Sequence, residues 1–279
     1  MAEAIWRRII SGPLSGAANM ALDEALFRSV QAGISPPVLR LYRWQPATVT
    51  LGYGQRGDNQ VNVAVCKNLG VDIVRRLTGG RAVLHADELT YAVIAPERGM
   101  FSNNILGNYR QIAEAIQHCL QQLGLSVEMV SGRHDYKGES AAEQSACFTA
   151  PSYFELSCHG RKICGSAQKR DAECFLQHGS LPVDLDPAFL FAALNCEGER
   201  SIEQGARSLE KKIGWINRWV KQSVSIAHVE KQFIASFEHC FDAPFFDDQP
   251  TTHEMIMARE LEQTKYANPD WNMKGIITK

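Results

Sequence analysis

Short strand-like segments follow one another closely through the first two-thirds of the chain, whereas the last third has the spacing of helices. Strands that succeed each other without an intervening helix pair through turns, as in antiparallel sheets. A chain that alternated strand and helix throughout would build a doubly wound parallel sheet instead. The order of the segments therefore predicts an α+β fold.

Strands are marked by apolar runs that glycine, proline and polar residues interrupt. The predicted strands cover Val38–Trp44, Ala47–Leu51, Val71–Leu77, Ala82–Ala95, Ser126–Val130, Tyr153–Cys158, Lys162–Ser166 and Phe175–Val183. Apolar residues at helical spacing mark the helices, the first of which is capped by Ser15. The predicted helices cover Ala18–Val30, Val61–Leu69, Ile105–Leu123, Phe189–Leu194, Ile202–Trp219, Ile226–Phe241 and Thr252–Thr264. Gly132–Ala146 is polar without any period, which predicts a long and mobile loop.

The composition excludes several classes of function. The 29 Lys and Arg residues nearly balance the 31 Asp and Glu residues, so no basic excess points to nucleic acid or an anionic membrane. No apolar run reaches the roughly 18 residues of a membrane span, and the N-terminus lacks the apolar stretch of a signal peptide. The 8 cysteines contain no C-x-x-C pair, so we expect reduced thiols in the cytoplasm and no zinc site.

The segment Gly52-Tyr-Gly54-Gln-Arg-Gly57 matches the G-x-G-x-x-G fingerprint of dinucleotide-binding proteins and follows a predicted strand. The helix that this fingerprint requires is not evident in the sequence. Asp58 would also place a carboxylate beside the pyrophosphate. A glycine-rich turn is therefore the expected structure, and no nicotinamide cofactor is predicted.

Arg75-Arg76-Leu-Thr-Gly-Gly-Arg81 places two adjacent glycines between predicted strands. Such a pair forms either a plain turn or a place where the backbone approaches a ligand closely. The G-K-[ST] ending of a phosphate-binding loop is missing. His85 and His178 lie within predicted strands, where histidine is usually a hydrogen-bonded core or surface residue.

Cys147 and Lys162 stand out by their context. Cys147 ends the polar loop and precedes a turn, where a side chain can be held against a substrate, although a lone cysteine is more often a small buried apolar residue. Lys162 opens a strand of small and apolar residues. It is either a solvated charge at a sheet edge or a cation directed inward beside Gly165, Ser166 and Ala167.

Four motifs occur in one order along the chain: Arg75–His85, Gly160–Gln168, Gln177–Leu181 and Lys265–Asn272. Together they resemble the biotin/lipoate protein ligase and transferase family, and the similarity runs from about Trp6 to Trp271. The resemblance implies the catalytic-domain fold of this family, with a mixed, mostly antiparallel sheet flanked by helices. It also implies a single domain over residues 1–279, in which a helical segment from about 187 packs on the mixed core and no accessory domain follows.

Within this family, Ser145–Leu156 is similar to the octanoyltransferase branch, whose cysteine in this segment is catalytic. The resemblance implies that Cys147 forms a thioester with the acyl group and that Lys162 lies beside it. The implied substrate-binding residues are Arg75, Gly79, Gly80, His85, Gly165, Ser166, Ala167 and His178. The chain departs from the family at Ala86, where an aspartate commonly follows the histidine.

The implied reaction moves an octanoyl group from octanoyl-acyl carrier protein to a lysine of a lipoyl domain, such as the glycine-cleavage H protein, in lipoate biosynthesis. No cofactor is expected, because a thioester donor is already activated. Arg75 and Arg76 would reach the acidic surface or the phosphopantetheine phosphate of the carrier. The alternatives are an ATP-dependent lipoate ligase, an octanoyl amidotransferase between lipoyl-type proteins, and a protein that only binds lipoyl domains.

Overall fold

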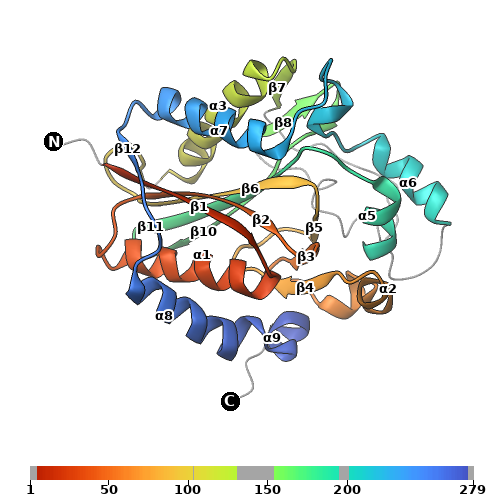
Figure 1. Ribbon diagram of the computed structural model, residues 1–279, viewed down its shortest axis with the longest axis horizontal. Coiled ribbons are helices and arrows are strands. Elements are labelled where there is room, and N and C mark those ends of the chain that lie inside the picture. The colour runs from red at the N-terminus through yellow and green to blue at the C-terminus, as the bar shows by residue number, and fades with distance from the viewer. Residues whose placement is uncertain (1–4, 103, 131–153, 195–200, 276–279) are drawn as a thin grey trace.

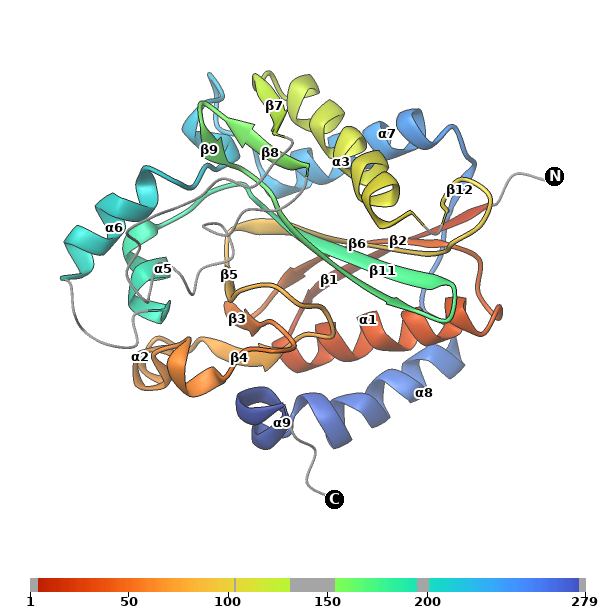
Figure 2. The same ribbon diagram turned by 180° about the vertical axis from the view of Figure 1, so that it is seen from behind.

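The computed structural model describes residues 5–102, 104–130, 154–194 and 201–275, and its centre is a six-stranded sheet (Figures 1 and 2). In spatial order its strands are β10 (Gly165–Asp171), β11 (Cys174–Pro182), β6 (Glu88–Pro96), β2 (Val38–Trp44), β1 (Trp6–Leu14) and β12 (Phe245–Asp247). The strands from β10 to β2 pair antiparallel, and β1 pairs parallel with β2 and β12. The expected α+β fold with a mixed, mostly antiparallel sheet is confirmed.

Strands β1 and β12 are absent from the sequence prediction, so the expectation of a wholly helical last third was wrong. Trp6–Leu14 lacks a clean period of two, and its pairing with β2 shifts register between Ser11 and Pro13. Phe245–Asp247 is only 3 residues long and pairs with the first strand across almost the whole chain. Both strands are formed by long-range pairing, which no local pattern reveals.

Helices cover both faces of this sheet. Helices α1 (Gly16–Gln31) and α8 (Thr252–Leu261) lie on one face, and α3 (Ile105–Gln122) and α7 (Ile226–Phe241) lie on the other (Figure 1). The alternation of β2 serves both layers, since Leu39 and Leu41 join the α3–α7 core whereas Val38 and Tyr42 join the α1–α8 core. As predicted, Ser15 caps α1, accepting a hydrogen bond of 3.2 Å from a backbone N–H.

Two smaller sheets complete the strands. One contains β3 (Thr48–Leu51), β4 (Asp72–Arg75) and β5 (Val83–His85), and the other contains β7 (Val127–Val130), β8 (Glu155–Cys158) and β9 (Arg161–Lys162). The single long strand predicted over Ala82–Ala95 was wrong. The chain bends at Ala86 and Asp87, so β5 and β6 belong to different sheets, and a cavity lies between those sheets.

The remaining elements are short and pack around the sheets. They are η1 (Gly57–Asn59), α2 (Val63–Asn68), α5 (Pro187–Leu194), α6 (Ile202–Glu210), η3 (Ile216–Arg218), the π-helical η4 (Glu262–Tyr266) and α9 (Pro269–Lys274). The helix predicted over Ile202–Trp219 ends at Glu210, because Ile213 bridges to Lys162 in a strand-like contact. Among the described helices, none combines the length and apolar character needed to cross a membrane.

Candidate active site

A cavity of about 330 Å³ lies between the six-stranded sheet, the β3–β4–β5 sheet and α1. Apolar and aromatic side chains form much of its wall, together with two histidines. The lining residues are Met20, Tyr42, Trp44, Thr50, Arg76, Val83, His85, Thr90, Gly165, Ser166, Ala167, His178, Gly179 and Ser180. The structure thus brings five of the predicted site residues to one cavity: His85, Gly165, Ser166, Ala167 and His178.

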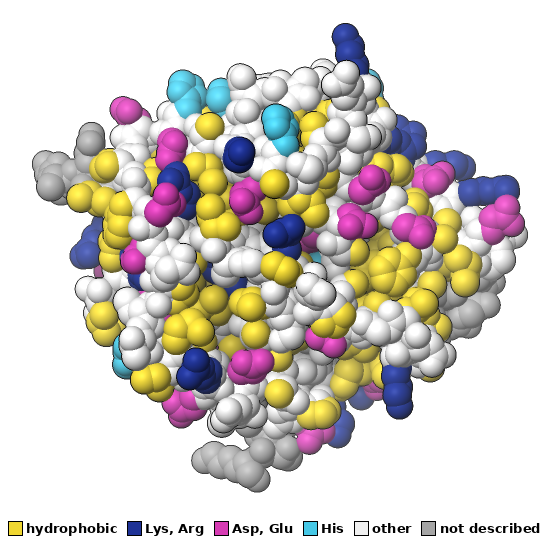
Figure 3. All heavy atoms as spheres, viewed as in Figure 1, with side chains coloured by type: hydrophobic (Ala, Val, Ile, Leu, Met, Phe, Trp, Pro, Cys, Tyr) yellow, Lys and Arg dark blue, Asp and Glu magenta, His cyan; other side chains and the backbone are white. Residues whose placement is uncertain are grey.

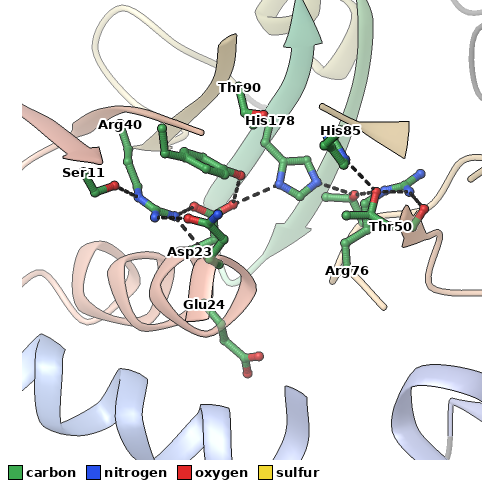
Figure 4. Close-up of polar contacts among 12 residues, drawn as sticks. Ser11, Asp23, Glu24, Arg40, Thr50, Arg76, His85, Thr90 and His178 are labelled. Atoms are coloured by element: carbon green, nitrogen blue, oxygen red, sulfur yellow. Dashed lines mark hydrogen bonds and ion pairs between the residues drawn. The ribbon is translucent and has the colours of Figure 1, made fainter. Parts of the chain in front are cut away.

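His178 is held between a buried carboxylate and a threonine (Figure 4). Its Nδ1 lies 3.1 Å from Oδ2 of Asp23, and its Nε2 lies 2.7 Å from the hydroxyl of Thr78. Burial lowers the pKa of His178; Asp23 partly opposes this, and Arg76 adds to the lowering. The ring is therefore neutral, with Nδ1–H donating to Asp23 and Nε2 accepting from Thr78.

His85 repeats this arrangement on the other side of the cavity. Its Nδ1 lies 2.7 Å from Glu88, and its Nε2 lies 2.9 Å from the hydroxyl of Thr50. The ring also stacks on Trp44, with centroids 4.3 Å apart. Two carboxylate–histidine–threonine chains therefore flank the same cavity. One has its carboxylate on α1 and its histidine on β11, and the other has them on β6 and β5.

The two carboxylates are anchored by further donors. Asp23 accepts from Arg40 at 2.6 Å and from Tyr42 at 2.8 Å. Burial raises the pKa of Asp23, but Arg40, His178 and Tyr42 outweigh this, so the net pKa is lowered and the group is a carboxylate. Glu88 also accepts from the hydroxyl groups of Thr90 and Ser180.

Both chains converge on Arg76, whose five N–H groups all donate within the protein. Nε donates to the hydroxyl of Thr78, and Nη1 donates to both the hydroxyl and the carbonyl oxygen of Thr50. Nη2 donates to the carbonyl oxygens of Gly79 and Arg81 at 2.7 and 2.8 Å. Arg76 is 4% exposed, so it holds the turn and the two threonines rather than reaching a carrier protein.

The predicted Gly79–Gly80 turn lies against the end of β3. A Cβ on Gly52 would lie only 1.9 Å from the carbonyl oxygen of Gly80, so this approach requires glycine. Gly80 has a φ of +92°, which favours glycine. A Cβ added to Gly80 would lie 3.9 Å from the Cβ of Ala167 in the cavity wall. Gly52 of the dinucleotide-like pattern therefore serves chain packing, and the element that begins at Gly57, η1, is only 3 residues long.

Arg75 does not line the cavity, contrary to its predicted role in substrate binding. It is fully buried, and Nε donates to the carbonyl oxygen of Trp271 at 2.7 Å. Its other donors reach the carbonyl oxygens of Gly52, Tyr53 and Met273. The first arginine of the motif therefore fastens α9 to β4, because a buried guanidinium needs this many acceptors.

Lys162 is buried and directed inward, which resolves the two alternatives that its sequence context left open. Its Nζ lies 3.3 Å from Oε2 of Glu155. A second cavity of about 250 Å³ borders this pair, lined by Tyr109, Ala113, Ile116, Phe154, Glu155, Leu156, Cys164 and Ser166. Glu155 lines the second cavity, and Ser166 lines both cavities. Ser166 therefore separates the cavity beside the Lys162–Glu155 pair from the first cavity.

Cys147 and the Gly132–Ala146 loop lie outside the described residues, so their predicted positions stay predictions. Within the ranges that the structure describes, no group of three or more histidine, cysteine, aspartate or glutamate side chains is arranged to hold a metal ion.

Sequence reasoning missed the residues that orient the histidines. Asn19 and Asp23 are one helical turn apart on the buried face of α1, where two polar residues among apolar ones are a recognisable signal. Glu88 and Glu155 gave no comparable signal, because each is a single acid within a strand-like segment.

Comparison with known proteins agrees with this architecture. Residues 15–238 match the model of the lipoyl protein ligase A/B catalytic domain family. The octanoyltransferases LipM of Brevibacillus brevis and Bacillus subtilis are 37% and 38% identical to the chain, covering 96% and 98% of it and 99% and 100% of their own lengths. A bipartite lipoate protein ligase from Thermoplasma acidophilum superposes with a TM-score of 0.82 at 27% identity, covering 99% of both chains.

The family match spans most of the chain, and these octanoyltransferases match it from end to end. The matched region includes the strands of the six-stranded sheet from β2 to β11 and the residues that line the cavity. The chain therefore belongs to the lipoyl protein ligase A/B catalytic domain family, and within it to the octanoyltransferases of the LipM type.

Proposed function

We propose that the protein transfers an octanoyl group from octanoyl-acyl carrier protein to a lysine of a lipoyl domain, such as the glycine-cleavage H protein. The transfer proceeds through a thioester on Cys147 in lipoate biosynthesis. The observation that carries this proposal is the similarity of the chain to octanoyltransferases over its whole length. The chain also has a cysteine at position 147 and a buried lysine at position 162.

The reaction has two balanced steps. The Cys147 thiolate attacks the thioester carbonyl of the donor, a new C–S bond forms, and the pantetheine sulfur leaves and takes up a proton. The neutral lysine amine of the acceptor then attacks the acyl-enzyme carbonyl. A C–N bond forms, Cys147 leaves as a thiolate, and the amine loses one proton. The product is an amide, and no nucleotide is consumed.

Lys162 supports the first step by its charge. A cysteine thiol titrates near ~8.5, so a neighbouring cation is needed to favour the thiolate at neutral pH. The same ammonium can donate a hydrogen bond to the carbonyl oxygen as negative charge develops on it. The ion pair with Glu155 holds the ammonium in place for both tasks.

The cavity between the two histidines suits the acyl chain. Burying seven carbons at ~0.8 kcal/mol each contributes about 5–6 kcal/mol, enough to hold the substrate in register. Met20, Tyr42, Trp44 and Val83 offer apolar surface for this contact. The two histidines already hydrogen-bond to Thr50 and Thr78, so an alkyl chain leaves neither ring unpaired.

The deciding experiment is the intact mass of the protein after mixing with octanoyl-acyl carrier protein in the absence of ATP. We expect a gain of one octanoyl group that hydroxylamine removes, and no gain in Cys147→Ala. If neither protein gains mass and activity requires ATP and free octanoate, Cys147 is not a nucleophile and the proposal is wrong.

An ATP-dependent ligase is the second candidate, because a structural relative of 27% identity and TM-score 0.79 is a lipoate-protein ligase A bound with ATP. A ligase would keep its activity in Cys147→Ala. An octanoyl amidotransferase would accept an octanoylated lipoyl-type protein as donor and reject octanoyl-acyl carrier protein, so exchanging the donor separates it from the proposal.

A further inference from the structure

Cations gather on the surface next to Lys162, and we call this surface the basic face. It consists of Arg161, Lys211, Lys212, Arg218 and Lys221, from the β8–β9 hairpin and the segment between α6 and α7. Lys and Arg side chains stand along the upper right margin of the molecule in Figure 3, with acidic side chains below them. The net charge of the whole chain is only −2, so this clustering is local.

The basic face is joined directly to the strand of Lys162. The backbone N–H of Lys162 donates to the carbonyl oxygen of Lys212 at 3.0 Å, and the N–H of Gly214 donates back to the carbonyl oxygen of Lys162 at 2.8 Å. Arg161 precedes Lys162 on β9. A molecule bound on the basic face therefore lies beside the lysine that the proposed chemistry uses.

The two arginines of this face are held in place through backbone oxygens. Arg161 Nε and Arg218 Nη1 donate to the same carbonyl oxygen, that of Glu210, at 2.9 and 3.0 Å. Arg218 also lies over the ring of Trp215, 4.5 Å from its centroid. Among the residues that the structure describes, neither guanidinium forms an ion pair with a carboxylate.

The charges of this face are only partly offset. Burial lowers the pKa of Arg218, the proximity of Arg161 lowers it further, and the exposed Glu210 acts in the opposite direction. Asp184 lies at the margin, where it accepts a hydrogen bond from Asn217. A face that holds two arginines close together against this repulsion is suited to an anionic partner.

We propose that the basic face is the docking surface for the acidic carrier protein that presents the thioester donor. This inference rests on the proposed function and replaces the expectation that Arg75 and Arg76 contact the carrier, since both are buried. The donor fits better than the acceptor, because a carrier brings carboxylates and a phosphodiester to this surface, whereas the acceptor brings a lysine ammonium.

The test reverses two exposed lysines of the face, Lys211→Glu with Lys221→Glu, neither of which makes a side-chain contact among the described hydrogen bonds and ion pairs. Lys67→Glu with Arg259→Glu is the matched control. It makes the same change in net charge at two other exposed cations, on α2 and α8, and neither side chain forms a hydrogen bond or ion pair among the described residues. Acyl-enzyme formation is measured with octanoyl-acyl carrier protein, octanoyl-coenzyme A and octanoyl-N-acetylcysteamine.

We expect KM for octanoyl-acyl carrier protein to rise about tenfold at low salt in the Lys211/Lys221 variant, with a weaker salt dependence. The control and the rate with octanoyl-N-acetylcysteamine should stay unchanged. An equal rise with octanoyl-coenzyme A would show that the face binds only phosphate, which overturns docking of a protein. A rise confined to the lipoyl-domain acceptor, or no rise, also overturns the proposal.

A binding measurement that requires no acyl transfer tests the docking surface independently of the proposed function. Cys147→Ala is titrated with octanoyl-acyl carrier protein, with and without the Lys211/Lys221 changes, and Kd is measured by calorimetry. A Kd that the two changes weaken supports the docking surface even if no acyl-enzyme forms in the unmodified protein. A Kd that they leave unaltered refutes the surface, whatever the enzyme does.

Discussion

At the scale of single residues, the candidate site depends on groups that do not touch a substrate. Asp23 and Glu88 each fix the ring of one histidine, and Arg76 fixes the threonine beyond each ring. Hydrogen bonds of this kind set both the tautomer and the orientation of an imidazole. Both histidines beside the cavity are therefore hydrogen-bonded within the protein at both ring nitrogens.

The buried ring of His178 should make stability depend on pH. Its pKa is lowered on folding, so below the unfolded value of about 6.5 the unfolded chain binds a proton that the folded chain rejects. Stability is then fully present above pH 6.5 and declines as the pH falls toward the folded pKa, by at most about 1.4 kcal/mol per pH unit.

The measurement is urea unfolding between pH 5 and 8 for the unmodified protein and for His178→Gln. We expect a steeper loss toward low pH in the unmodified protein, since the variant lacks the titrating ring. Equal slopes would mean that folding does not lower the pKa of His178, which contradicts this account. The lowered pKa of Asp23 acts below about 3.9, outside this range.

Replacing Asp23 removes the partner of a buried arginine. Asp23→Asn leaves Arg40 without its anion in the core, so we expect unfolding free energy to fall by about 3–5 kcal/mol, measured by urea denaturation at pH 7. Asp58→Asn is the control at an exposed aspartate, where the change should stay within about 0.5 kcal/mol. A loss below 1 kcal/mol for Asp23→Asn would contradict this account.

The sequence analysis predicted the histidines of this network and missed the carboxylates that hold them. His85 and His178 lie in motifs, and so do the small residues from Gly165 to Ala167, so resemblance selected them. Asp23 lies in a helix, and Glu88 lies beside a bend where the sequence pattern predicts one continuous strand. Their role depends on the distance between separate elements, which local periodicity does not contain.

At the scale of elements, the approach of β3 to the Gly79–Gly80 turn depends on Gly52. Gly52→Ala would force its Cβ into the carbonyl oxygen of Gly80, so we expect a loss of about 1–3 kcal/mol in unfolding free energy. Gly54→Ala is the matched control in the same loop, since an added Cβ there meets nothing within 4 Å. Equal stability of the two variants in urea would disprove the close approach.

Helix α9 is fastened by Arg75 through the carbonyl oxygens of Trp271 and Met273. Arg75→Lys keeps the charge but cannot reproduce the planar set of donors. We expect faster hydrogen exchange across residues 269–275 and a loss of about 1.5–3 kcal/mol. Unchanged exchange in this helix, relative to α3 as an internal reference, would argue against the fastening role.

Element prediction succeeded where a segment carries its own period and boundary residues. Helix α7 and strand β2 have the predicted bounds, because a cap or a turn delimits each of them. The helix predicted over Thr252–Thr264 divides into α8 and the π turn η4, then gives way to α9, and the predicted strand over Ala82–Ala95 divides at Ala86. In each case tertiary contacts interrupt a pattern that continues in the sequence.

At the scale of the whole molecule, the two ends of the chain meet in one sheet and one helix layer. Strand β12 pairs with β1, and Arg7 on β1 donates to Glu254 on α8 at 2.8 Å. We propose that the chain is therefore one cooperative domain rather than a core with a separable helical segment. Tryptophan fluorescence and far-UV circular dichroism should give coincident urea transitions, and two distinct midpoints would refute this.

The saturated guanidinium of Arg76 has a consequence for substrate affinity. Because its five N–H groups are already satisfied, the turn from Thr78 to Arg81 is preorganised before any acyl chain arrives. Ordering a flexible side chain on binding costs about 0.5–1.5 kcal/mol. Arg76 and Thr50, which line the cavity next to this turn, are spared that cost. The conformational entropy of these side chains is thus lost during folding and not on binding. More of the free energy from burying the alkyl chain therefore remains available to hold the octanoyl group.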